Sequence, residues 1–416
     1  MSAVVDLRPL RENPVFRRLW LGTTASGFGG QLGAFAVTFY VWDRTHNPAM
    51  VGLAGLVTAV PLIVLALAGS AFADHVDRRR LALGCAWGQI AVSAAMAGVA
   101  ATDAGGVPLM LVLAGAGSGL AALGGPARHT FIPALLAGER LAAGLALNHL
   151  SFQLSLLLGP VAAGLVTAGW GTAWCFALDA ATFGFALIGI AGLPRGLPVA
   201  QGRPGAAAVA DGFRFAARTP EVRGAFLADL AATMLAMPFA LFPVINEERF
   251  GGRPEVLGLF SAAVAVGGVL ASVLSGLATH RRHPGTVLLA CGTVWSLALA
   301  LVGLSGHLPV VLLLLAVAGA ADTWAVVSRG TVVQTSTPPG YRGRVSSLEH
   351  IVGSAGPQLG NLRAGLVAAT SSSAASLAGG GLLAAAAIGL IAVTTPALRR
   401  FTVTGQVADG VRAPVP

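Results

Sequence analysis

The sequence has little charge, no lysine, three cysteines and few aromatic residues. Only 10% of its 416 residues are charged and 6% are aromatic, whereas 55% are hydrophobic and the mean hydropathy is +0.77. A soluble globular domain is about 25% charged, because charged side chains cover its surface. The composition therefore excludes a cytosolic enzyme, a secreted disulfide scaffold and a disordered chain, and it indicates an integral membrane protein.

The missing lysines and sparse cysteines exclude several kinds of site. A Walker nucleotide loop needs a lysine, which argues against self-contained ATP-driven transport. Cys85, Cys175 and Cys291 lie in apolar stretches without metal-ligand or disulfide spacing. The sequence also contains no HExxH motif and no nucleophile elbow. We therefore expect no enzyme activity, no cofactor and no metal site.

Long apolar runs fill most of the chain. A membrane-spanning helix needs about 20 mainly apolar residues, and twelve such runs are present: 18–42, 50–73, 81–102, 107–127, 143–168, 172–193, 222–246, 256–279, 285–305, 309–333, 345–369 and 375–395. The longest polar stretch, 194–221, separates six spans from six. The sequence thus predicts an all-α membrane protein with two six-helix bundles, 18–193 and 222–395, and terminal segments 1–17 and 396–416.

The arginines are distributed unequally between the two sides of this topology. All 26 basic residues are arginine, and twenty fall on the side of the termini, against Arg44, Arg249 and Arg253 on the other. The positive-inside rule makes the side with more arginine cytoplasmic. We therefore expect both termini in the cytoplasm, with residues 1–17 leading into a retained helix rather than a signal peptide. Membrane orientation also explains the net charge of +9 better than nucleic-acid binding does.

The two halves repeat weakly at an offset of about 200 residues. Arg128 and Arg329 occupy matching positions, and Gly159–Pro160 matches Gly356–Pro357. Two parallel six-helix repeats with the pathway between them form one recognised transporter architecture.

The segment 70–80, between the second and third spans, resembles the signature loop of the major facilitator superfamily, Gly-x-Leu-Ala-Asp-Arg-x-Gly-Arg-Arg/Lys. Asp74 and the basic pair Arg78 and Arg79 keep its spacing, while Ser70 and Asp77 replace the two glycines. In that family the loop locks one conformation, and the resemblance implies this role for Asp74 and Arg78. The alternative is an arginine cluster that only sets membrane orientation, beside a solvated aspartate.

A second motif, Ser155-x3-Gly159-Pro160-x-x-Ala163-Gly164, is similar to the Gly-x3-Gly-Pro-x-x-Gly-Gly motif of proton-coupled exporters in this superfamily. Proline removes a backbone hydrogen bond, and small residues permit close helix packing. The alternative is the general abundance of Pro and Gly in membrane helices.

Scattered similarity over about 320 residues resembles the enterobactin-exporter and macrolide-efflux branch. It is carried by Ser26–Gly30, Pro61, the Asp74 loop, Pro126–Arg128, Phe131–Pro133, Asp179 and Arg342–Val345. The sequence departs from that branch at Gly30, where an Asp is usual in the first span. If that Asp carries protons in relatives, this protein must use another carboxylate or couple differently.

Ionisable residues inside spans are costly unless they are paired or hydrated, and they often mark transport sites. Asp322, about 13 residues into its span and near the midplane, is our first candidate for the proton site, followed by Asp179 and Asp229. Static pairing with an arginine of another helix, or structural hydrogen bonding, is the alternative. The intramembrane basic residues are Arg128, Arg329 and Arg363. Snorkelling explains the first two equally well, whereas Arg363 is a candidate for attracting an anionic group.

Uncharged polar and aromatic side chains within spans are candidates for the substrate cavity: Gln31, Gln153, Trp324, Gln358 and Asn361. Bonds between helices are the alternative for the amides.

The sequence thus predicts a monomeric transporter of the bacterial inner membrane, rocking two bundles around a midplane cavity. By resemblance it exports a small, partly hydrophobic drug, antibiotic or siderophore in exchange for protons. Proton-symport uptake, or a non-transporting sensor or assembly protein, are the alternatives.

Overall fold

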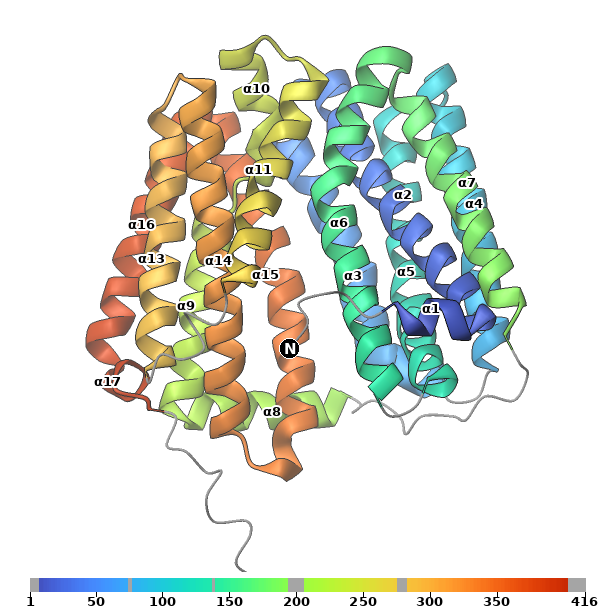
Figure 1. The fold of residues 1–416 in the computed structure, drawn as a ribbon. Coiled ribbons are helices and arrows are strands. Elements are labelled where there is room, and N and C mark those ends of the chain that lie inside the picture. Colours follow the sequence, from blue (N-terminus) through green and yellow to red (C-terminus); the bar gives the residue numbers. More distant parts are fainter. Residues whose placement is uncertain (1–6, 74–76, 137–138, 194–205, 275–282, 403–416) are drawn as a thin grey trace, which may run out of the picture.

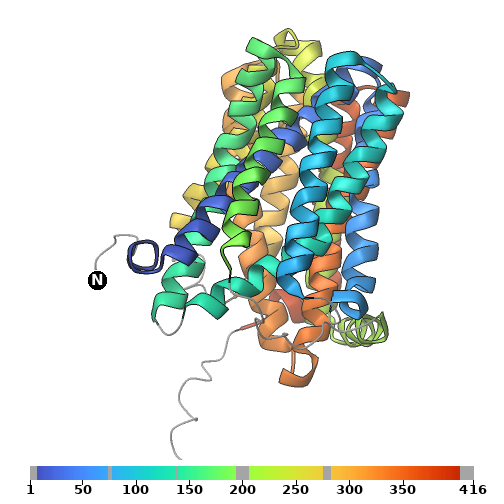
Figure 2. The same ribbon diagram turned by 90° about the vertical axis from the view of Figure 1, so that its right-hand side faces the viewer.

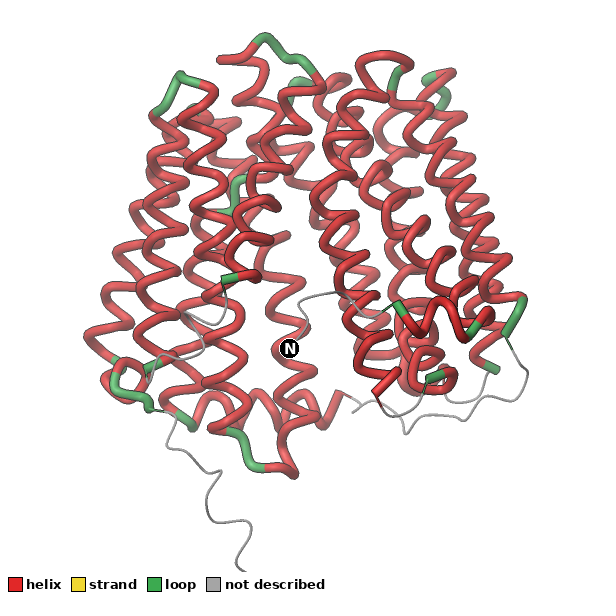
Figure 3. The backbone as a smooth tube through the Cα atoms, in the orientation of Figure 1, coloured by secondary structure: helices red, strands yellow, loops and turns green. Residues whose placement is uncertain are grey.

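The computed structural model describes residues 7–73, 77–136, 139–193, 206–274 and 283–402. Within these ranges nearly all of the backbone is helical and none of it forms a strand (Figure 3). The prediction of an all-α protein is therefore confirmed.

Six long helices form the first half (Figure 1): α2 (Pro14–Thr45), α3 (Pro48–Ala73), α4 (Arg78–Thr102), α5 (Gly106–Leu135), α6 (Glu139–Trp170) and α7 (Thr172–Ala191). A short α1 (Arg8–Glu12) precedes them. Within this half, α2 packs against α6 and α7, and α4 packs against α5 and α7.

The second half consists of α9 (Pro220–Ala236), η1 (Phe239–Leu241), α10 (Phe242–Phe250), α11 (Pro254–Val273), α13 (Pro284–Leu304), α14 (Leu308–Ser336), η2 (Pro339–Tyr341), α15 (Arg342–Thr370), α16 (Ser373–Thr394) and α17 (Pro396–Arg399). Here α13 packs against α14 and α16, and α9 packs against α15 and α16. With α9, η1 and α10 counted as one broken span, the described residues supply twelve helical columns.

Local sequence explains where many of these helices begin. Proline occupies the first helical turn of α2, α9, α11 and α13, where its missing N–H has no helical partner to lose. The Asn13 side chain also accepts a hydrogen bond from the Phe16 N–H, at 2.9 Å, and Ser372 accepts from the Ala375 N–H, at 3.1 Å. Both are N-caps, which satisfy donors that the first turn leaves free.

The run 222–246 differs from the continuous span that the sequence predicts. Its helix stops at Ala236 and resumes through η1 into α10. Pro238 has no N–H to donate, and Met237, the residue before it, adopts an extended conformation. The break therefore follows from a Met-Pro pair inside an apolar run.

Ten helices in the described part of the chain are long and apolar enough to cross a membrane. The two columns outside that set are α2 and α15. Their polar residues include Thr23, Ser26, Gln358 and Asn361, and these side chains line a central cavity. The polar residues of these two membrane-length helices thus face the cavity between the halves.

The segment 194–221 contains a helix that the sequence reasoning did not predict, α8 (Ala206–Arg218). Both ribbon views place it across one end of the bundle (Figures 1 and 2). It packs on α15, where Asp211 Oδ2 lies 3.6 Å from Arg344 Nη1. Phe215 of α8 also stacks on Tyr341 of η2, with ring centroids 5.1 Å apart. We call this end of the molecule the linker end.

The two halves meet at the opposite end, which we call the closed end. An apolar cluster there joins residues of both halves, among them Val41 of α2, Phe242 of α10 and Val256 of α11. Helix α6 packs on α11, and α3 packs on α15. In Figure 1 the ribbons of the two halves separate toward the linker end.

Candidate functional site

A cavity of about 1110 Å³ lies between the halves. Its wall includes residues of all six long helices of the first half, α2 to α7, and of α9, α10, α11, α13, α14 and α15 from the second. It extends from Trp20, near the linker end of α2, to Thr38, near the closed end. The position of this cavity between two packed bundles is that of a transport pathway.

Glycines bring the two halves together at the closed end. A Cβ placed on Gly164 of α6 would lie 2.6 Å from the carbonyl oxygen of Pro254 in α11. A Cβ on Gly52 of α3 would lie 2.7 Å from the carbonyl oxygen of Asn361 in α15. These helices can approach so closely because glycine carries only a hydrogen where other residues carry a side chain.

The Gly-Pro motif of α6 therefore lies at an interface between the halves. A Cβ on Gly258 of α11 would lie 2.6 Å from the carbonyl oxygen of Pro160. Gly159 faces Gln31 of α2, and the Ser155 hydroxyl donates to the Ser151 carbonyl oxygen at 2.9 Å. Pro160 and Ser155 also line the cavity.

Polar groups add to the closure. The Trp42 indole N–H of α2 donates to Glu247 Oε2 of α10 at 2.6 Å, and His46 Nε2 lies 3.4 Å from Glu247 Oε1. Both contacts join the first half to the second. The sequence analysis missed Glu247 because this residue falls just beyond the end of the predicted span 222–246.

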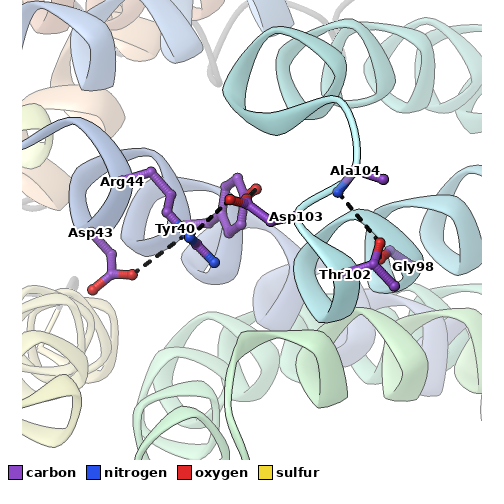
Figure 4. Close-up of polar contacts among 7 residues, drawn as sticks. All are labelled: Tyr40, Asp43, Arg44, Gly98, Thr102, Asp103 and Ala104. Atoms are coloured by element: carbon purple, nitrogen blue, oxygen red, sulfur yellow. Dashed lines mark hydrogen bonds and ion pairs between the residues drawn. The ribbon is translucent and has the colours of Figure 1, made fainter.

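A separate network fixes the closed end of the first half (Figure 4). Asp103, in the turn between α4 and α5, accepts from the Tyr40 hydroxyl at 2.6 Å and from Arg44 Nη1 at 3.0 Å. Asp43 lies 3.9 Å from Arg44 Nε. These contacts tie the end of α2 to the α4–α5 turn.

The second half contributes a charged cluster to the cavity. Arg329 of α14 forms an ion pair with Asp229 of α9 through Nη1, and its Nε lies 3.4 Å from Glu349 Oε1 of α15. The Arg329 side chain is 9% exposed and that of Asp229 is 13% exposed. The guanidinium is thus held by two carboxylates from two other helices.

Asp322 lies about two helical turns before Arg329 on α14 and belongs to the same part of the cavity wall. Its side chain is exposed to the cavity, and it interacts electrostatically with both Asp229 and Arg329. Among the described residues it has neither an ion-pair nor a hydrogen-bond partner. The structure therefore brings Asp322, Asp229 and Arg329 together with Glu349, whereas the sequence relates only Asp322 to Arg329.

Asp179 of α7 lies on the part of the cavity wall that the first half of the chain forms. It is 7% exposed, and its Oδ2 accepts from the Ser93 hydroxyl of α4 at 2.7 Å. Its Oδ1 has no hydrogen-bond partner in the described structure. Gly29 and Gly33 of α2 leave room for this carboxyl group, since a Cβ on either would lie 2.8 or 3.3 Å from its oxygens.

The uncharged candidates divide into two groups. Gln31, Gln153, Gln358 and Asn361 line the cavity. Asn361 also accepts from the Ala240 N–H at 3.1 Å, which holds the backbone at the break of α9. Trp324 is not part of the cavity wall that the described residues form, because its indole N–H donates to the Ala271 carbonyl oxygen of α11 at 2.9 Å.

The other predicted site residues lie outside the cavity or outside the described structure. Arg363 contacts α16, where a Cβ on Gly380 would lie 2.7 Å from its Nη2. Asp74 falls outside the described residues, as do the side chains of Ser70 and Arg128. Arg78 begins α4, and Arg79 donates to the Ala191 carbonyl oxygen at 2.6 Å.

Asp77 has a structural role that the sequence reasoning did not assign. Its side chain accepts from the Arg80 N–H at 2.8 Å and caps the start of α4. The residue that departs from the signature loop thus stabilises the helix that follows the loop. Groups of three or more His, Cys, Asp or Glu side chains suited to a metal are absent from the part of the chain that the structure describes.

Comparison with known proteins places these features in context. A family described as transmembrane secretion effectors matches residues 4–408. The enterobactin exporter EntS of Shigella boydii serotype 18 is 29% identical over 360 residues, covering 85% of this chain and 86% of the exporter. EntS of Escherichia coli O81 is 28% identical over the same length and coverage.

Solved transporters share the fold at low sequence identity. A bacterial homologue of the human lysosomal transporter Spinster, inward-facing and unoccupied, has a TM-score of 0.72 at 15% identity, covering 93% of this chain and 98% of its own. The nucleoside transporter NupG has a TM-score of 0.74 at 12% identity, covering 93% of this chain and 100% of its own.

Proposed function

This chain belongs to the transmembrane secretion effector family of major facilitator transporters, and we propose that it is a proton-coupled exporter of a small, partly hydrophobic compound. It is a multi-pass membrane transporter homologous to enterobactin exporters, and its family and relatives are transporters rather than enzymes. Kinship with those exporters supports outward transport of a siderophore, drug or antibiotic. The arginine distribution supports a bacterial inner membrane orientation with the linker end in the cytoplasm.

The single observation that carries proton coupling is Asp322. It is a carboxyl group on the cavity wall without a described partner, beside the Asp229–Arg329 pair. Ionisable residues at such depth are costly and mark proton or ion pathways. In this proposal Asp322 takes up and releases the proton while the bundles rock around the cavity.

The test uses inverted membrane vesicles with an acidic interior reported by a pH-quenched dye. Macrolides, dyes, catechol siderophores, sugars and amino acids are added in turn. We expect one class to release protons in the wild type, and we expect this response to be lost in Asp322→Asn. The matched control is Asp43→Asn, which changes an exposed carboxylate outside the cavity wall. An unchanged response in Asp322→Asn would exclude Asp322 as the proton site.

Alternating access makes a second prediction at the closed end. Glu247→Gln weakens the contacts with Trp42 and His46, so the halves should separate there more often. Because Glu247 is 44% exposed, the change is worth roughly 0.5–1 kcal/mol, or about a two- to fivefold shift in the population open at the closed end.

That shift is measurable with a cysteine at Gly30, which lines the cavity and has open space around its Cβ position. In a chain whose three native cysteines are replaced, a membrane-impermeant maleimide added at the closed end reports opening. Labelling should rise in Glu247→Gln and stay constant in Glu12→Gln, which changes an exposed carboxylate away from the closed end. Equal labelling of the two variants contradicts a gating role for Glu247.

A further inference from the structure

The cavity wall has an excess of negative charge among its described residues. Its ionisable members are Asp179, Asp229, Asp322 and Arg329. The one guanidinium is already bound by Asp229 and Glu349. An entering ligand therefore meets three wall carboxylates and no arginine that is free to bind an anion within this described set.

Asp322 is the carboxylate most available to a ligand. Asp229 is committed to Arg329, and Asp179 is buried and holds the Ser93 hydroxyl. Asp322 is exposed to the cavity and has no described ion-pair partner. A cleft lined by charge of one sign concentrates ligands of the opposite sign.

Aromatic side chains cover other parts of the same wall. Trp20, Phe35, Phe152, Phe239, Phe242 and Trp295 all line the cavity. Aromatic faces provide large apolar contact areas and attract cations through their π electrons. Trp295 is 5% exposed, and its Nε1 has no hydrogen-bond partner in the described structure. This N–H is itself buried, so Trp295 contributes apolar surface to the wall.

We propose that the transported compound is a lipophilic cation, with Asp322 as its counter-ion in the cavity. This proposal rests on the proposed function and selects among the compounds that it allows. An anion of the same size and apolar surface is excluded, because it would lie beside unneutralised carboxylates. The aromatic wall binds the apolar part of the compound, and Asp322 binds the charge.

The test compares two ions of nearly the same shape and opposite charge, tetraphenylphosphonium and tetraphenylborate. Equilibrium binding of radiolabelled tetraphenylphosphonium is measured on the full-length protein in nanodiscs, with empty nanodiscs subtracted. We expect saturable binding of tetraphenylphosphonium, and no saturable binding of radiolabelled tetraphenylborate in a separate titration. Asp322→Asn should weaken this binding roughly tenfold to thirtyfold. Asp322→Glu should keep most of the affinity, and Asp43→Asn should keep all of it.

Two outcomes overturn the proposal: saturable binding of tetraphenylborate as tight as that of tetraphenylphosphonium, or unchanged tetraphenylphosphonium binding in Asp322→Asn. A failure of proton-coupled export gives a different result from a failure of the cation assignment. Selective binding of the cation with no proton release by any lipophilic cation in vesicles supports this assignment of charge and overturns proton-coupled export. Proton-coupled export of anionic compounds alone supports export and overturns the cation assignment.

Discussion

Replacing Arg329 with glutamine is expected to abolish transport and to destabilise the protein by about 3–5 kcal/mol, which is the usual cost of removing one partner from a buried ion pair. Asp229, 13% exposed, loses the cation that it contacts. Glu349 loses the same partner, but at 19% exposure it is better solvated. Three helices, α9, α14 and α15, meet at this guanidinium, so its removal also loosens the wall of the cavity.

The measurement is the free energy of unfolding in detergent, together with proton release in vesicles. Asp229→Asn added to Arg329→Gln removes the unpaired carboxylate, so the double variant should recover a large part of the lost stability while transport stays absent. Arg253→Gln, at an exposed position on the closed end, is the matched control. If the double variant is less stable than Arg329→Gln alone, the ion pair is not the source of the effect.

The sequence predicts this cluster only in part, for a geometric reason. Asp322 and Arg329 are seven residues apart on one helix, and helical periodicity places them on nearly the same face. Their partners come from helices about 100 residues earlier or 20 residues later in the chain. Membrane helices are apolar on most faces, so periodicity does not show how each helix is rotated toward its neighbours. Glu349 could have been found only as a carboxylate near the start of a predicted span.

The fold was more predictable than the contacts within it. Apolar run length predicts the helical columns, because each must match the thickness of the bilayer. The break at Pro238 had a visible signal, a Met-Pro pair, but its effect depends on whether neighbouring groups such as Asn361 replace the lost helical bonds. For Trp324 the sequence carries no comparable signal. A tryptophan within a span can line a cavity or bond to a neighbouring helix, and here it bonds to α11.

Replacing Gly164 with leucine is expected to prevent closure of the closed end and to abolish transport. A Cβ at this position would lie 2.6 Å from the Pro254 carbonyl oxygen and 3.1 Å from the Glu255 Cα, and neither backbone atom can rotate away. Overpacking of this kind costs about 1–3 kcal/mol. Because the contact joins α6 of one half to α11 of the other, the cost falls on the conformation seen here and not on the folding of either bundle. Each 1.4 kcal/mol changes the ratio of the two conformations about tenfold.

The cysteine at Gly30 reports this shift directly. Maleimide labelling from the closed end should rise on the order of tenfold in Gly164→Leu, and labelling from the linker end should fall. Gly169→Leu is the matched control, because Gly169 lies on the same helix and a Cβ there meets no atom within 4 Å. Unchanged labelling together with retained transport in Gly164→Leu would show that α6 and α11 do not separate during the cycle. Lost transport with unchanged labelling would instead place the defect in substrate binding, since the motif also lines the cavity through Pro160.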